Sequence, residues 1–158
     1  MTDKVKLDGK DKKIIEQLLI NARQSIADIA KKTKLPRDVV RYRIDRLEST
    51  GVVRNYYALI DTSKLGYPLY VYVGFSLLNI EPDEEEQFLK FLKSQKQITY
   101  VAKNSGKWDF SIGVAAKYYQ DIDNFIREIR KKFSKAIKDF EVTPVIQDYK
   151  YNHVTDLI

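Results

Sequence analysis

The sequence predicts an α+β protein, in which a small helical part precedes a part with the element order β-α-β-β-α-β. Two observations predict this division. Residues 1–60 carry 14 Lys and Arg against 8 Asp and Glu, whereas residues 61–158 carry 14 of each. Aromatic content changes at the same place, because residues 1–60 include three Tyr and neither Phe nor Trp. We therefore expect two domains, 1–60 and 67–158, joined by a linker at 61–66.

Three helices are expected in the first domain. Asp8 is placed to cap the first helix, and Ser25 and Asp28 form a variant capping box before a second, shorter helix. The third helix starts at Pro36, because proline suits a first helical position, and Gly51 ends it. The apolar residues of the first helix recur at helical spacing: Ile14, Ile15, Leu18, Leu19 and Ala22.

The third helix has one apolar stripe, formed by Val40, Ile44 and Leu47. Two short helices, a turn and a helix with a polar outer side are the order of a helix-turn-helix, whose last helix enters the major groove of DNA. The polar side and the flanks of the stripe supply the candidate DNA contacts: Arg37, Asp38, Arg41, Tyr42, Arg43 and Arg46. Arg43 lies nearer the apolar stripe, and we expect it to anchor phosphate or neighbouring structure. In the alternative interpretation, Arg41 pairs with acidic residues of its own helix and the charges form only a solvated face.

The chain after the third helix is expected to be extended. Residues 52–60 contain Arg54 and Asn55, where a turn can form because Asn tolerates a positive φ. Arg54 is a further candidate DNA contact.

The second domain reads as four strands and two helices. Residues 68–78 have apolar side chains on both faces, which is typical of a central strand covered twice. A helix follows the acidic residues 83–86, and residues 98–104 and 110–116 are strands joined by a turn at 105–109. A second amphipathic helix contains Ile122 to Phe133, and residues 140–151 return as a strand. This order predicts a ferredoxin-like βαββαβ domain.

The strand at 110–116 has one large and one small face. Ser111, Gly113 and Ala115 leave the second face nearly flat. A flat face favours close approach by another backbone, a sheet or a ligand.

The first domain resembles the winged helix-turn-helix half of the Lrp/AsnC transcription regulators. The shared features are the LD at Leu7, the NAR at 21–23, V-x-x-R-I-x-x-L from Val40 to Leu47, and GVV before a tyrosine. Two positions depart from the family pattern: Pro36 stands where a capping serine is common, and Asn55 where glycine is common. In the second domain, the segment from Val101 to Asp109 is similar to the G-x-[aromatic]-D turn of the family's effector-binding domain.

The resemblance implies a regulator that binds double-stranded DNA, forms homodimers and, in some members, assembles four dimers into an octamer. It also implies an amino-acid effector beside the turn, at Ser105, Gly106, Lys107, Asp109 and Thr143. Lys107 departs from the acidic residue that is common in the family. The alternative for this segment is a tight hairpin in which Gly106 supplies a positive φ and Trp108 contacts the core.

The composition argues against other classes of function. There is no cysteine, the single histidine is His153 near the end of the chain, and no glycine-rich phosphate loop is present. Catalytic, metal and cofactor sites are therefore not expected, and no apolar run approaches the roughly 20 residues of a membrane span. We expect a cytoplasmic transcription regulator. Two alternatives stay open: an architectural DNA-binding protein without an effector and, with less support, an enzyme on the ferredoxin-like half.

Overall fold

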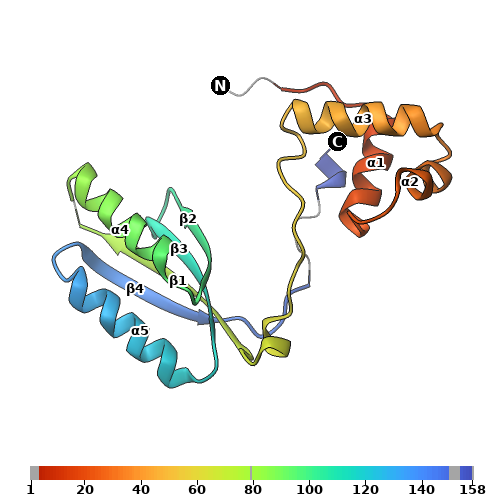
Figure 1. The fold of residues 1–158 in the computed structure, drawn as a ribbon. Coiled ribbons are helices and arrows are strands. Elements are labelled where there is room, and N and C mark those ends of the chain that lie inside the picture. The colour runs from red at the N-terminus through yellow and green to blue at the C-terminus, as the bar shows by residue number, and fades with distance from the viewer. Residues whose placement is uncertain (1–3, 79, 150–153, 158) are drawn as a thin grey trace. The chain divides into compact units, whose positions relative to one another are not determined.

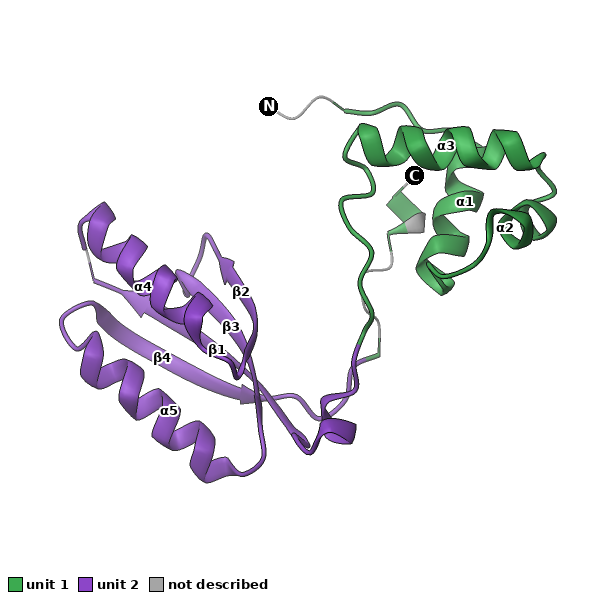
Figure 2. Ribbon diagram, viewed as in Figure 1, with its two compact units in different colours: residues 1–59, 149–158 green, residues 60–148 purple. Residues whose placement is uncertain are grey.

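The computed structural model describes residues 4–78, 80–149 and 154–157 of the chain. These residues form two compact units (Figure 1, Figure 2). Unit 1 comprises residues 1–59 and 149–158, and unit 2 comprises residues 60–148.

Unit 1 contains three helices: α1, Gly9–Ile20; α2, Ile26–Thr33; and α3, Arg37–Ser49. The predicted capping groups are in place. The Asp8 carboxylate accepts hydrogen bonds from the backbone amides of Lys10 and Asp11, at 2.8 and 3.0 Å. The Ser25 hydroxyl accepts a bond from the amide of Asp28, at 3.1 Å.

Both ends of α3 differ slightly from the sequence-based expectation. Pro36 is the residue before the helix and not its first member, since its ψ of 145° is extended. Its carbonyl still accepts the first helical bond, from the amide of Val40 at 3.0 Å. At the other end Gly51 has a φ of 70°, as expected for a C-terminal cap. The chain bends there, at 51–53, and not at Arg54 and Asn55.

The core of unit 1 comes from all three helices. Leu19 and Ala22 were expected in the core, but neither lies there. Leu19 is 37% exposed, and Ala22 is exposed beyond the end of α1. The 3₁₀ turn η2, Thr155–Leu157, lies against α1, which places this part of the C-terminal segment in unit 1 instead of the second domain. The buried apolar side chains are Ile14, Ile15, Ile29, Ala30, Val40, Ile44 and Leu47.

A buried carboxylate joins α1 to α3. Asp11 is fully buried, and it accepts hydrogen bonds from Arg43 Nη1 at 2.7 Å and Arg46 Nη1 at 3.4 Å. Arg43 Nη1 also donates to Asp8, at 2.8 Å, and Arg46 Nη2 donates to the carbonyl of Lys6, at 2.6 Å. The hydrogen bond to Asp11 is the main reason that the pKa of Arg43 is raised. Two of the four arginines of α3 are therefore held against the start of α1.

The described residues of unit 1 contain no strand. Residues 54–61 have no regular secondary structure, so the wing that the resemblance implies is an irregular, extended segment here. One contact ties this segment to α3: Tyr56 Oη donates to Glu48 Oε1 at 2.7 Å.

Unit 2 is the ferredoxin-like βαββαβ sandwich that the sequence predicts. Its elements are β1, Leu69–Leu77; α4, Pro82–Ser94; β2, Ile98–Lys103; β3, Phe110–Ala116; α5, Tyr119–Lys132; and β4, Ile137–Pro144. The sheet has the order β2-β3-β1-β4, and every neighbouring pair is antiparallel. Both helices contribute to one core on one face of the sheet: Val71, Val73 and Phe75 of β1 lie in it with Phe88 of α4 and Ile126 of α5.

In the described part of unit 2, both helices pack on one face of the sheet and none lies on the other, so β1 is covered by helices once and not twice. Tyr100, Gly113, Tyr72 and Thr143 lie side by side across this open face, in β2, β3, β1 and β4. Tyr72 and Tyr100 are 39% and 47% exposed.

The chain's own aromatic rings occupy the small positions of the open face. A Cβ added at Gly113 would clash with the hydroxyl of Tyr70, and one added at Gly74 would lie 2.6 Å from Cγ of Trp108. The flat face of β3 therefore receives side chains of the same unit. Trp108 was expected to contact the core in the hairpin alternative, but it lies over Gly74 of β1, on the face opposite the core.

The first prediction concerns the buried carboxylate. Replacing Asp11 with Asn removes the charge that pairs with Arg43 and Arg46, and we expect unit 1 to lose about 1–3 kcal/mol of stability. Native-state hydrogen exchange of α1 and α3 amides measures this loss, with α4 and α5 amides as an internal reference. Asp45→Asn, on the exposed side of α3, is the matched control and should change protection by less than about 0.5 kcal/mol. Equal protection in Asp11→Asn and the wild type would contradict the anchoring role.

Candidate nucleic-acid interface

The outer side of α3 carries the predicted DNA contacts. Arg37, Asp38, Arg41 and Tyr42 are all exposed, and Tyr42 is 67% exposed. Arg37 and Arg41 are one helical turn apart, so their guanidinium groups point from the same side of the helix. Among the described residues, neither arginine has a carboxylate within 4 Å. The alternative in which Arg41 pairs within its own helix is therefore not the arrangement observed.

Arg43 and Arg46 differ from these two arginines. Their guanidinium groups bind Asp8, Asp11 and the backbone of Lys6, and their side chains are only 15% and 32% exposed. A guanidinium with these bonds satisfied inside its own domain has few donors left for a base edge. Arg43 was expected to anchor phosphate or neighbouring structure, and it binds neighbouring structure at Asp8 and Asp11. Arg46 was expected to take part in recognition, and it binds Asp11 and the carbonyl of Lys6. A contact of either arginine with DNA stays a prediction.

Arg54 is exposed in the segment that follows α3. Two residues later Tyr56 is bound to Glu48, and the pKa of Tyr56 is raised to about 12, first by burial and then by this hydrogen bond. The protonated phenol is the donor that the contact needs, so the segment stays attached to the last turn of α3 at neutral pH. This attachment keeps Arg54 near the C-terminal end of the helix.

The exposed groups match the chemistry of DNA recognition. A guanidinium can donate two hydrogen bonds to the O6 and N7 atoms of guanine, and a carboxylate such as that of Asp38 can accept from the amino group of cytosine. Phenol and guanidinium groups also bind phosphate oxygens. An α-helix with its side chains is about 10–12 Å across, which fits a major groove about 12 Å wide.

The predicted effector turn at 105–109 is attached to β1 through Asp109. The amide of Asp109 donates to the carbonyl of Phe75, and the amide of Asn104 donates to the carbonyl of Asp109, both at 2.8 Å. Asp109 Oδ2 accepts a hydrogen bond from the amide of Leu77 at 2.6 Å, so one oxygen of this carboxylate holds the turn against β1. Gly106 has a φ of 156° and Ser105 is exposed.

The remaining predicted effector residues lie on the open face of the sheet. Lys107 Nζ is 3.7 Å from Glu141 Oε2 and 4.3 Å from the centroid of the Trp108 ring. Thr143 is two residues beyond Glu141 along β4, beside Tyr72. The turn and Thr143 therefore share one face, and Glu141 stands between them.

Three features of these sites were not anticipated from the sequence. They are the burial of Asp11, the ion pair of Lys107 with Glu141, and the ring of Trp108 over Gly74. The acidic start of α4 was anticipated, and there Glu85 binds Lys103 and Glu86 binds Lys90.

His153 lies outside the described residues. In the part of the chain that the structure describes, no helix is long and apolar enough to cross a membrane, and no group of three potential metal ligands is present.

Comparisons with known proteins agree with this arrangement. The family model for winged helix-turn-helix DNA-binding matches residues 7–54. An HTH-type transcriptional regulator of Pyrococcus abyssi is 30% identical over 125 residues, which cover 79% of this chain and 77% of that protein. The HTH-type transcriptional regulator FL11 of Pyrococcus horikoshii is 28% identical over 123 residues, covering 78% of this chain and 80% of FL11.

Solved structures extend the likeness to both units. LrpC of B. subtilis is 25% identical with a TM-score of 0.79, covering 92% of this chain and 99% of LrpC. A transcriptional regulator of Neisseria meningitidis, solved in complex with L-Met, is 19% identical with a TM-score of 0.84, which shows a common fold over 97% of this chain and all of that one. The helix-turn-helix with its outward arginines, the ferredoxin-like unit and these relatives agree, and the chain belongs to the Lrp/AsnC family of DNA-binding transcription regulators.

Proposed function

We propose that Arg37, Arg41 and Tyr42 make the sequence-specific contacts of this regulator, with Asp38 beside them. The observation that carries the proposal is the division of the arginines of α3. Arg37 and Arg41 are exposed and have no carboxylate partner in the described part of the chain, whereas Arg43 and Arg46 bind Asp11. Arg54, attached near the end of α3, contacts phosphate. The protein acts in the cytoplasm, where it meets its DNA.

The arginines of α3 can be tested against a binding site that the wild-type protein selects from a random DNA pool. We expect Arg41→Ala to weaken binding to that site by about 1–3 kcal/mol, because one bidentate contact is lost. Fluorescence anisotropy at fixed salt measures the affinity, and footprinting shows whether a few phased sites or the whole DNA is protected.

Two further variants control for charge and for folding. Arg23→Ala removes one positive charge from the loop after α1 and should cost less than Arg41→Ala. Arg43→Ala should lower the stability of unit 1 while the folded protein keeps its sequence preference, since Arg43 binds Asp8 and Asp11. Retention of full affinity for the selected site by Arg41→Ala would remove Arg41 from the interface.

The protein acts as a homodimer through the open face of its sheet, and four dimers can form an octamer. Tyr72 and Tyr100 are partly exposed and lie edge to face, with ring centroids 6.4 Å apart. An exposed aromatic surface of this kind is typical of a protein interface. A dimer also presents two copies of α3, which a helix-turn-helix protein needs to read two half-sites about 10 bp apart.

Sedimentation at micromolar concentration tests the assembly. We expect the wild type to sediment as a dimer or a larger closed assembly, and Tyr72→Glu to sediment as a monomer, because the new charge would be buried in the interface. Tyr118→Glu, which adds the same charge at the start of α5, should leave the assembly intact. A wild-type monomer that binds its selected site tightly would contradict the proposal.

An amino acid regulates the protein from the turn at 105–109. The relative of known structure that binds L-Met supports this class of effector. The turn offers the exposed Ser105 and Gly106 for a carboxylate, and Glu141 and the second oxygen of Asp109 for an ammonium group. Lys107, paired with Glu141, favours an effector with an additional acidic group.

Calorimetry with each of the twenty amino acids tests the turn. Gly106→Ala should weaken the binding of the effector more than Lys107→Ala does, because a Cβ disturbs a backbone with positive φ that aims the donors. The reverse order would mean that the Lys107 side chain makes the site. No heat from any amino acid at about 1 mM would exclude an amino-acid effector of useful affinity.

A further inference from the structure

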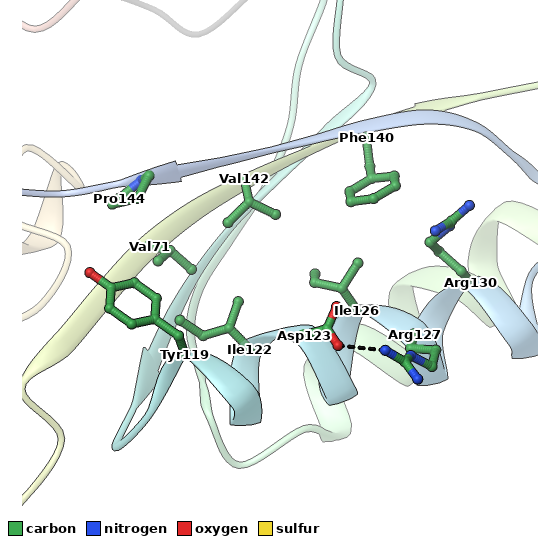
Figure 3. A pocket seen from close by; sticks show the side chains of 10 residues that line it. All are labelled: Val71, Tyr119, Ile122, Asp123, Ile126, Arg127, Arg130, Phe140, Val142 and Pro144. Carbon is green, nitrogen blue, oxygen red and sulfur yellow. Dashed lines mark hydrogen bonds and ion pairs between the residues drawn. The ribbon is translucent and has the colours of Figure 1, made fainter.

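A cavity of about 330 Å³ lies between α5 and the strands β1 and β4, on the helix-covered side of the sheet (Figure 3). Its floor consists of the buried side chains of Val71, Ile122 and Ile126. Its upper wall comes from β4, where Phe140 and Val142 are only partly buried. We call this cavity the α5–β4 groove.

The charged groups of the α5–β4 groove gather at one end. In Figure 3, Arg127 and Arg130 lie beside Phe140, whereas Tyr119 and Pro144 lie at the opposite end. Arg127 Nη2 is paired with Asp123 Oδ2 at 2.6 Å. The guanidinium of Arg130 lies 4.8 Å from the centroid of the Phe140 ring, and no carboxylate of a described residue lies within 4 Å of it. Two cations and one carboxylate leave this end with one excess positive charge.

The shape and the charge together define a ligand class. Apolar walls favour an apolar body, and 330 Å³ is near the lower limit of typical small-molecule pockets, so this body has about the size of a phenyl ring. An arginine without a carboxylate partner at the mouth favours a carboxylate at one end of that body. We propose that the α5–β4 groove binds a small carboxylate with an apolar body, held by Arg130 and Arg127 at its charged end.

The groove is separate from the turn proposed for the amino-acid effector. Val71 and Val142 face the groove, whereas Tyr72 and Thr143, their neighbours in sequence, face the open side of the sheet. The two sites therefore lie on opposite faces of the sheet and have no residue in common.

The experiment compares two probes that differ only in charge, 3-phenylpropanoate and 3-phenylpropanamide. Backbone amide chemical shifts of the full chain locate binding, and their titration gives the affinity. We expect the carboxylate to shift amides of β4 and α5 and the amide probe to bind roughly tenfold more weakly. Arg130→Gln should weaken the carboxylate to the level of the amide probe and leave the amide probe unchanged.

Three more variants test whether the probes occupy the groove. Val142→Phe places a ring in the groove at a partly exposed position and should abolish the binding of both probes. Lys131→Gln removes a positive charge from α5 at a residue that does not line the groove, and it should change neither affinity. Gly106→Ala, in the turn, should also leave both affinities unchanged, so failure of the turn as an effector site is distinguishable from failure of the groove.

A third probe distinguishes an amino acid from a simple acid. L-Phenylalanine adds an ammonium group to the same body, and Asp123 is the nearest carboxylate to accept it. If the natural ligand is an amino acid, L-phenylalanine binds more tightly than 3-phenylpropanoate, and Asp123→Asn weakens the binding of L-phenylalanine only. If the natural ligand is a simple acid, 3-phenylpropanoate binds more tightly than L-phenylalanine. The proposal is overturned if 3-phenylpropanoate causes no shifts at about 10 mM, if its affinity is unchanged in Arg130→Gln, or if its shifts lie at 105–109.

Discussion

The orientation of α3 depends on the carboxylate of Asp11. This group is fully buried near the start of α1 and accepts hydrogen bonds from Arg43 and Arg46. Successive residues of a helix are about 100° apart, so a helix anchored at two such residues cannot turn about its axis without breaking a charged hydrogen bond inside the domain. Once Arg43 and Arg46 face α1, Arg37 and Arg41 must face solvent. One acidic residue thus divides four arginines into two that hold the fold and two that are available to DNA.

This division explains why the third helix is both cationic and apolar. Arginine suits the inner positions because its planar guanidinium can bond several acceptors at once, as Arg43 does with Asp8 and Asp11. The same group suits the outer positions because it matches the edge of guanine. The inner arginines are paired with Asp8 and Asp11, whereas Arg37 and Arg41 on the outer side of α3 have no carboxylate within 4 Å among the described residues.

The sequence allowed correct prediction of the features that depend on neighbouring residues. The caps at Asp8 and Ser25, the stripe of Val40, Ile44 and Leu47, and the order of strands and helices in unit 2 arise from spacings of a few residues. The pairing of Arg43 and Arg46 with Asp11 was not predicted, because Asp11 belongs to a different helix and is distant in the sequence. Periodicity places both arginines beside the apolar stripe but does not reveal a buried acid across from them. The predicted start of α3 at Pro36 differed by one residue for a local reason. The φ that the proline ring imposes suits both the first helical residue and the residue before it.

The side chains that lie over the small positions of the open face were also not predicted. Tyr70 of the neighbouring strand lies over Gly113 of β3, Trp108 of the turn lies over Gly74 of β1, and only the strand order brings them there. A sequence pattern can show that a surface is flat without showing what covers it.

The pair of strands β1 and β4 connects the parts of this regulator that are proposed to bind ligands. Along both strands, alternate residues face the α5–β4 groove and the open side, so a displacement of β4 against β1 changes both surfaces together. The two chain segments that lead to unit 1 leave this pair of strands at the same end, one before Leu69 and the other after Pro144. The amide of Val145 continues the strand pairing by donating to the carbonyl of Tyr70, at 2.9 Å. A ligand that fixes the end of β4 therefore acts on the strand from which the chain returns to the DNA-binding unit. Coupling between sites requires an element whose state both sites can bias, and the paired strands β1 and β4 meet this requirement through covalent continuity with unit 1 as well as through hydrogen bonds.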